Sequence, residues 1–310
     1  MVISILLAIS ITFMYSAPLI FAGLGGVISE NAGVVNIGIE GMMTIGAFAG
    51  AAVGYFTANP WLGFLAGGLA GGLLALIHAV ACISFRADQT ISGVAINFLG
   101  PGLALFLSRK LFEGSTMTKP VPNQIPTLFG SYATNSSNLL LKAANMYMTI
   151  PIAFVFVLIM WFVLYKTSWG LRIRSVGENP AAADTLGINV NRVKYLCVFT
   201  SGVLSGLGGA AMTLAVVNYF TQSTISGQGF IALAAVIFGK WKPQGTMLAC
   251  LLFGFAQALV VLLGGSTSLI QIPSSILSML PYVLTLIILV VFVGKSTAPK
   301  ADGIPYFKGQ

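Results

Sequence analysis

Long apolar segments recur through the 310-residue sequence, separated by short polar stretches. A helix needs about 20 mostly apolar residues to cross the hydrocarbon core of a bilayer. The apolar segments cover residues 2–25, 35–56, 61–85, 89–108, 147–165, 194–217, 229–239, 244–264 and 275–294. Most of them are long enough to cross. The sequence therefore predicts an all-α polytopic membrane protein, with residues 1–310 forming a single transmembrane domain.

The seventh segment, residues 229–239, is too short to cross alone. It is followed by GKWKPQG, in which Pro243 and Gly245 interrupt a regular helix. Irregular backbone at membrane depth is tolerated where it is buried in protein or lines a cavity. We therefore expect a half-helix or an interrupted helix here, and about 8–10 transmembrane helices with broken or re-entrant segments in all.

Composition excludes several classes of protein. Hydrophobic residues make up 57% of the chain and charged residues only 7%, which excludes a soluble enzyme. The net charge of +8 comes from Lys and Arg scattered through loops, whereas nucleic-acid binding needs a basic stripe. The cysteines, Cys82, Cys197 and Cys250, lie in apolar segments without CxxC spacing, and the chain has one His. We expect no metal site, no cofactor and no nucleic-acid partner.

The chain is not expected to be an enzyme. GKS at residues 294–296 resembles the end of a phosphate-binding loop, but Leu289 stands where the leading glycine should be and no strand precedes it. A GxSxG nucleophile motif is missing as well. ATP hydrolysis by this chain and intramembrane proteolysis are therefore both disfavoured.

The positions of Lys and Arg predict the orientation, because these residues are enriched in cytoplasmic loops. The loop 166–194, the break at 240–242 and the C-terminal tail carry basic residues, whereas the loops 218–228 and 265–274 carry none. We therefore expect the loop 166–194 and the C-terminus in the cytoplasm of a bacterium, with the chain in the plasma membrane. The first segment has no charged n-region and is read as a retained span.

The first half of the chain fits this orientation less well. The loop 109–146 contains four basic residues but must be external if the spans alternate. Its content of Pro, Asn and Ser suits either an ordered external cap or a flexible loop. Nine segments give an external N-terminus, and one misread broken helix would reverse it.

A polar stretch, GENPAAADTLGINVNRVK at residues 177–194, lies between two apolar segments. Asn179 is a typical N-cap, Pro180 suits the first helical position and Gly187 suits a C-terminal stop. We expect a helix of about two turns, which would be marginal alone in water. It is either a capped connector between spans or a docking helix with Leu186 and Ile188 as apolar anchors.

The stretch RSVGENPAAADTLGINVNRVK (174–194) resembles the cytoplasmic loop of permease subunits of bacterial ABC importers in the ribose, galactose and branched-chain amino acid group. Two other stretches agree with it: ISENAGVVNIGIEGMMTIGAFAG (28–50) and GQGFIALAAVIFGKWKPQGT (227–246). Together with ADQTISGVAINFLGPGL (87–103), they are similar to the nucleoside-importer branch, which works with a basic-membrane-protein type lipoprotein. The resemblance covers nearly the whole chain.

The resemblance implies a type II ABC importer-like permease fold and a set of partners. These are a cytoplasmic ABC ATPase that uses ATP and Mg²⁺, an extracellular substrate-binding lipoprotein, and a second permease, most simply a related heterologous chain. It also implies that the loop forms a coupling helix that seats in the ATPase. The residues expected to couple are Glu178, Asn179, Pro180, Ala181, Ala182, Ala183, Asp184, Leu186 and Gly187.

The cargo is expected to be a neutral polar solute, because the spans contain few ionisable groups. Nucleosides are the first choice, and a simple sugar or another small solute stays open. The main rival is an ion-coupled secondary transporter, a class that normally shows coupling carboxylates or broken helices in both halves. Glu40 is the one strong carboxylate candidate here.

The candidate residues for a pathway or gate are Asn36, Glu40, Asn97, Gln222 and Gln228. An ionised carboxylate at mid-membrane costs about 2.5–3.5 kcal/mol on insertion scales, so Glu40 should be paired, near an interface, or facing water. We favour structural or gating work for it. Asn97 either contacts a passing solute or bonds a neighbouring helix. Gln222 and Gln228 either line an external mouth or belong to a polar loop.

Two further patterns indicate helix packing. His78 stands alone among apolar residues, which favours a hydrogen bond between helices over a proton relay. Glycines recur at intervals of three or four residues and allow helix backbones to approach closely. They are Gly67, Gly68, Gly71, Gly72, Gly202, Gly206 and Gly209.

Overall fold

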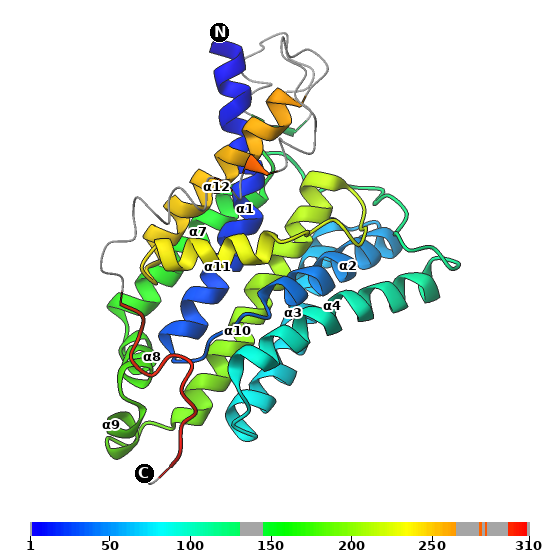
Figure 1. Cartoon of the computed structure of the whole chain (residues 1–310). Coiled ribbons are helices and arrows are strands. Elements are labelled where there is room, and N and C mark those ends of the chain that lie inside the picture. The colour runs from blue at the N-terminus through cyan, green and yellow to red at the C-terminus, as the bar shows by residue number, and fades with distance from the viewer. Residues whose placement is uncertain (1, 131–144, 265–278, 281–282, 284–296, 309–310) are drawn as a thin grey trace.

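The computed structural model describes residues 2–130, 145–264, 279–280, 283 and 297–308. Over these ranges the chain is almost entirely helical (Figure 1). The α-helices are α1 (Val2–Asn31), α2 (Ile39–Thr57), α3 (Pro60–Ala79), α4 (Gln89–Leu111), α7 (Thr149–Lys166), α8 (Ser168–Glu178), α9 (Pro180–Thr185), α10 (Val190–Ala211), α11 (Gln228–Phe238) and α12 (Pro243–Leu263). Two π-helical segments, η1 (Val80–Ser84) and η2 (Met212–Val217), continue α3 and α10.

Seven helices in the described part of the chain are long and apolar enough to cross a membrane. The helix α11 is apolar but has 11 residues, so it extends about 16 Å at about 1.5 Å per residue. The predicted all-helical class and the predicted half-helix are confirmed. The ninth apolar segment, residues 275–294, lies almost wholly outside the described residues.

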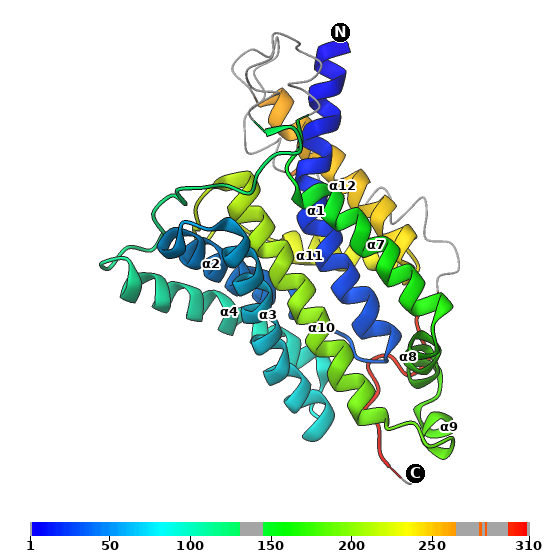
Figure 2. The ribbon, with the colours of Figure 1, turned by 180° about the vertical axis from the view of Figure 1, so that it is seen from behind.

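The helices pack around α10, which contacts α1, α2 and α3. Figures 1 and 2 show α1, α7 and α12 gathered on one side of α10, with α2, α3 and α4 on the other. The helices α8 and α9 lie at the same end of the molecule as the C-terminus, and the N-terminus lies at the opposite end (Figure 1). The described C-terminal residues and the loop 166–194 therefore share one end, as predicted.

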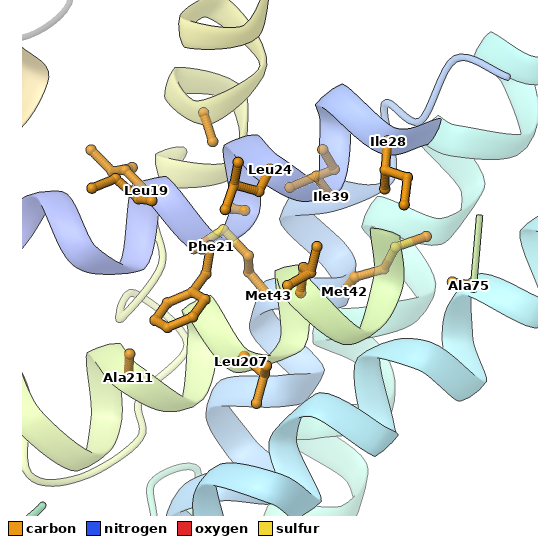
Figure 3. Packing of buried hydrophobic residues seen from close by; sticks show 14 of the residues in the cluster. Leu19, Phe21, Leu24, Ile28, Ile39, Met42, Met43, Ala75, Leu207 and Ala211 are labelled. Atoms are coloured by element: carbon orange, nitrogen blue, oxygen red, sulfur yellow. The ribbon is translucent and has the colours of Figure 1, made fainter. Parts of the chain in front are cut away.

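The apolar core lies where α1, α2 and α10 meet (Figure 3). Phe21 of α1 and Met43 of α2 are fully buried there, with Leu207 of α10 beside them. Inside a membrane there is little hydrophobic drive between helices, so close van der Waals packing holds such a core together. This core fixes α10 against both neighbouring groups of helices.

Glycines bring α3 and α10 into backbone contact, as the sequence predicted. A Cβ atom at Gly206 would collide with the carbonyl oxygen of Gly67, and one at Gly71 would collide with the carbonyl oxygen of Gly202. A Cβ atom at Gly209 would collide with the backbone of α2. The small residues therefore allow three helices to pack at a separation that any larger residue would prevent.

The helix α1 extends six residues beyond the predicted segment 2–25, and that boundary was wrong. Polar side chains at its end find partners close by. Ser29 Oγ donates to the Val34 carbonyl at 2.7 Å. Asn31 Nδ2 donates to the carbonyls of Val27 and Trp241, at 2.7 and 3.0 Å. Because the side chains of Ser29 and Asn31 have hydrogen-bond partners within the protein, these polar residues do not end α1.

The part of the loop 109–146 that is described forms an ordered cap. Backbone amides of Thr118, Val121 and Ile125 donate to carbonyls in the segment 214–220, at 3.1, 2.9 and 3.1 Å. Asn123 Nδ2 also donates to the Ala58 carbonyl at the end of α2, at 2.8 Å. Residues 115–130 therefore cover the ends of α2 and η2, which favours the cap of the two predicted alternatives.

His78 joins α3 to α4 and to the chain before α2. Its Nδ1 lies 2.9 Å from Ser92 Oγ, and its Nε2 lies 3.2 Å from the Val35 carbonyl oxygen. Since a carbonyl can only accept, Nε2 carries the proton and Nδ1 accepts from the serine hydroxyl. The predicted bond between helices is confirmed.

Candidate functional site

The first turns of α2 and α11 meet through Glu40. Its Oε1 accepts a hydrogen bond from the Gly227 amide at 2.6 Å, and its Oε2 accepts one from the Gly229 amide at 2.7 Å. The first amides of a helix otherwise lack partners and carry partial positive charge. Glu40 therefore caps the half-helix α11, which accounts for a carboxylate among apolar segments.

Two predicted pathway residues are held by bonds within the chain. Asn97 of α4 accepts from the Gly41 amide at 2.8 Å and donates to the Ile37 carbonyl at 2.9 Å. Asn36 is fully buried and donates to Ser201 Oγ of α10 at 2.8 Å. Both side chains fix the irregular segment 32–38 that leads into α2. Of the two alternatives for Asn97, this geometry favours the bond to a neighbouring helix.

A cavity of about 590 Å³ lies among η2, the loop 218–227, α11 and α12. Gln228 lines this cavity, whereas Gln222 is exposed and is not among the lining residues. Among the residues that the structure describes, none that lines it is charged. Its polar groups come from Tyr219, Thr221, Ser223, Thr224, Ser226, Gln228 and Gln257.

The predicted short helix is α9, which lies at the end of the molecule opposite the cavity. Asn179 Oδ1 accepts from the Ala182 amide at 3.0 Å, Pro180 occupies the first turn, and Gly187 adopts a φ of 79°. Asparagine, proline and glycine thus take the roles that the sequence predicted for them. The local sequence is sufficient to form this helix.

Side chains of α9 divide into exposed and buried sets. Leu186 is 81% exposed, and Ala181 and Ala182 are also exposed. Ala183 is only 2% exposed, and Ile188 packs against the core, so these two side chains contact the chain itself. The exposed surface of α9 and the residue that follows it is therefore centred on Leu186.

A C-terminal strap, residues 297–308, runs across this end of the molecule (Figure 1). The Ala301 amide donates to the Gly177 carbonyl at 2.9 Å, and the Lys300 amide donates to Glu178 Oε2 at 3.2 Å. Further along the strap, the Arg86 guanidinium lies 4.5 Å from the ring centroid of Phe307. The strap thus connects the end of α8 to the turn before α4.

Charged groups are buried under the strap. Lys194 Nζ of α10 donates to the Gly33 carbonyl at 3.2 Å, and Trp241 Nε1 donates to the Glu30 carboxylate. Burial raises the pKa of Asp302 to about 7, and the positive charge of Lys194 opposes that rise. These contacts were not predicted, because they join distant segments and no local pattern in the sequence marks them.

Comparison with known proteins agrees with this geometry. Residues 7–291 match the family model described as branched-chain amino acid transport system / permease component. The chain belongs to this permease family. It is therefore a multi-pass membrane protein of the ABC permease type, and the predicted family is confirmed.

Several relatives carry names that include a solute. This permease is 49% identical to the guanosine ABC transporter permease protein NupQ of Bacillus subtilis, over 96% of each chain. It is 45% identical to the nucleoside ABC transporter permease protein NupC of Lactococcus lactis, over 96% of this chain and 95% of that one. It is 25% identical to the guanosine ABC transporter permease protein NupP of Bacillus subtilis, over 78% of this chain and 70% of that one.

A solved ABC transporter in an inward-facing conformation is also similar in structure. It matches with a TM-score of 0.47 and 22% identity, over 90% of this permease and 84% of that chain.

Proposed function

We propose that this permease is the transmembrane subunit of an ATP-driven ABC importer and forms part of the pathway for nucleosides. One structural observation carries the proposal: the cavity, which has no charged residue among its described lining residues, and the exposed α9 lie at opposite ends of a single helical rod. The rod, α10 with η2, runs through 28 residues, Val190–Val217. At about 1.5 Å per residue it is about 40 Å long, enough to cross a bilayer.

The solute follows from the cavity and the relatives together. A cavity lined by hydroxyl and amide groups suits a neutral polar molecule. Nearly full-length relatives at 49% and 45% identity are named for guanosine and for nucleosides. Nucleosides therefore fit better than a simple sugar or an ion.

The partners follow from the permease family and from the exposed surface of α9. A cytoplasmic ABC ATPase binds α9 and hydrolyses ATP with Mg²⁺, a lipoprotein delivers the nucleoside outside, and the C-terminus lies in the cytoplasm of a bacterium. The second permease is a related heterologous chain. In support, Bacillus subtilis has two permeases named for guanosine, and this chain is 49% identical to one and 25% identical to the other.

Coupling would start at α9 and travel through buried contacts. Closure of the ATPase around nucleotide moves α9, and the strap at Gly177 links that motion to α8. The rod α10 begins four residues after Leu186 and carries the displacement toward the cavity. Nucleotide binding shifts the equilibrium between two states of the pathway, because the ATPase binds α9 differently in each.

An ion-coupled transporter is supported less well. Glu40 is its strongest candidate for a coupling carboxylate, and both oxygens of Glu40 already accept from backbone amides of α11. In this arrangement the Glu40 carboxylate caps the first turn of α11.

The test is uptake of radiolabelled guanosine by cells that produce the complete importer, together with pull-down of the ATPase. Ala182→Asp with Leu186→Asp should abolish both, while the permease inserts at normal levels. Phe85→Asp is the matched control, since Phe85 is 78% exposed in the turn that follows η1. Undiminished uptake in the α9 variant, an equal loss in the control, or uptake without any ATPase would overturn the proposal.

A further inference from the structure

We propose that the cavity among η2, α11 and α12 is a binding subsite for an intact, uncharged nucleoside, with the amides of Gln228 and Gln257 facing the base. The inference rests on the proposed function and makes it more specific. It assigns the site at which the transported solute binds within this permease. It also predicts which chemical relatives of that solute do not bind.

The cavity has the size and lining of a small-molecule site. Its volume of about 590 Å³ falls within the range of about 300–1,000 Å³ that is typical of ligand pockets. The lining combines apolar surface from Met212 and Val260 with hydroxyl and amide groups. A nucleoside also combines an apolar ring face with a polar edge and a sugar rich in hydroxyls.

The two glutamines reach the cavity from different helices. Gln228 belongs to the first turn of α11, and Gln257 lies in the middle of α12. Among the described residues, the buried Gln228 Oε1 has no hydrogen-bond partner, and Gln228 Nε2 contacts the weakly accepting sulfur of Met212 at 3.9 Å. A side-chain amide that offers both a donor and an acceptor matches the paired groups along the edge of a base.

Other side chains of the cavity complement the rest of a nucleoside. Tyr219 is 37% exposed and lines the cavity, where its ring can stack on a base. The hydroxyls of Thr221 and Thr224 lie 3.1 Å apart and can bond the hydroxyls of a ribose. The base and the sugar thus meet different groups, which favours a nucleoside over a free base or a hexose.

The Glu40 cap makes the subsite selective against phosphate. A helix N-terminus next to a cavity normally attracts anions, because its free amides point outward. Here the amides of Gly227 and Gly229, on either side of Gln228, already donate to Glu40. A phosphate group would find those donors occupied and carboxylate oxygens close by. The subsite should therefore bind a nucleoside and exclude the corresponding nucleotide.

The test labels a cysteine placed in the cavity. Ser223→Cys is introduced into the complete complex, in which the native Cys82, Cys197 and Cys250 of this chain are buried. Labelling by a thiol reagent is followed with guanosine, glucose or guanosine 5′-monophosphate present. Guanosine should slow labelling at least tenfold, and the other two should leave it unchanged. Thr57→Cys, exposed and outside the cavity lining, should show no protection by any of them.

A second variant tests the role of the amides. In the Ser223→Cys background, Gln257→Leu should raise the guanosine concentration needed for protection at least tenfold. Gln244→Leu, at the exposed start of the same helix, should leave it unchanged. Protection by glucose or by the nucleotide equal to that by guanosine would overturn the proposal, and so would equal effects of the two leucine variants.

The two proposals fail in different ways. If guanosine does not protect the introduced cysteine of the Ser223→Cys variant while ATP-dependent guanosine uptake is intact, the subsite is wrong and the proposed function stands. If the complex transports no nucleoside under any condition, the proposed function is wrong as well.

Discussion

Glu40, at the start of α2, accepts a hydrogen bond from the backbone amide of Gly229, at the start of α11, 189 residues further along the chain. The contact requires glycine, because a Cβ atom at position 229 would lie 2.6 Å from the Cα atom of Glu40. Two interrupted regions of the chain therefore stabilise one another. The half-helix α11 can begin inside the protein because its first amides have an acceptor in Glu40.

Glu40→Gln should weaken this junction. The amide keeps the shape of the side chain, but one of its two oxygens becomes a nitrogen that cannot accept from Gly227 or Gly229. Losing a charge-assisted helix cap costs about 1–3 kcal/mol. We expect a lower melting temperature of the purified complex. Glu113→Gln, at an exposed position after α4, is the control and should leave it unchanged. Equal melting temperatures for Glu40→Gln and the wild type would contradict the capping role.

Gly206→Ala should destabilise the contact between α3 and α10. The added methyl group has no room beside the Gly67 carbonyl, and overpacking of this kind costs about 1–3 kcal/mol. Gly102→Ala in α4 is the matched control, because a Cβ atom there meets nothing within 4 Å. Thermal unfolding of the two variants should separate them by several degrees. A control variant that is destabilised as much as Gly206→Ala would show that helix propensity or insertion, not packing, limits stability.

Ala182→Asp and Ala183→Asp should act by different routes, although the residues are adjacent. Ala182 is exposed, so its aspartate should block ATPase pull-down while the amount of inserted permease stays normal. Ala183 is 2% exposed, so its aspartate would bury an unpaired charge and reduce the amount of folded permease. Quantitative immunoblots of membranes, run beside the pull-down, distinguish the two effects. Identical behaviour of both variants would mean that α9 is not packed as described.

Local sequence signals predicted much of the fold. Apolar length placed the membrane-spanning helices within a few residues, because the cost of polar backbone in lipid leaves few alternatives to a helix. Asn179, Pro180 and Gly187 predicted α9 because capping acts over only a few residues. The end of α1 was misplaced, since Ser29 and Asn31 are satisfied by groups that the linear pattern does not show.

The candidate site was only partly predictable, because its contacts join distant segments. Gln222 and Gln228 look alike in TQSTISGQGF, yet only Gln228 lines the cavity. Gln257 stands in an apolar span, and its surroundings depend on how α12 packs against α1 and α11. The hydrogen-bond partners of Asn97 and Glu40 are likewise set by helix packing. A single sequence shows that such groups need partners, and the fold decides which partners they have.

Docking of the strap should depend on pH through Asp302. The ordinary pKa of an aspartate, 3.8, rises to about 7 for Asp302 because the side chain is buried. The folded strap therefore binds this proton more tightly than the released strap does. The stabilising contribution is complete below pH 3.8 and is lost as the pH rises through 7. Lys194 and Glu30 also face this site, and Lys194 opposes the shift.

Hydrogen exchange of the strap at pH 6 and pH 8, corrected for intrinsic rates, measures this dependence. Wild-type protection should be severalfold lower at pH 8, because ionised Asp302 is unfavourable under the docked strap. Asp302→Asn is neutral at both values and should keep most of its protection at pH 8. Glu113→Gln is the control, since Glu113 is exposed and follows the far end of α4; the strap of this variant should respond to pH as the wild type does. An unchanged pH response in Asp302→Asn would assign the dependence to Glu30 or Lys194 instead.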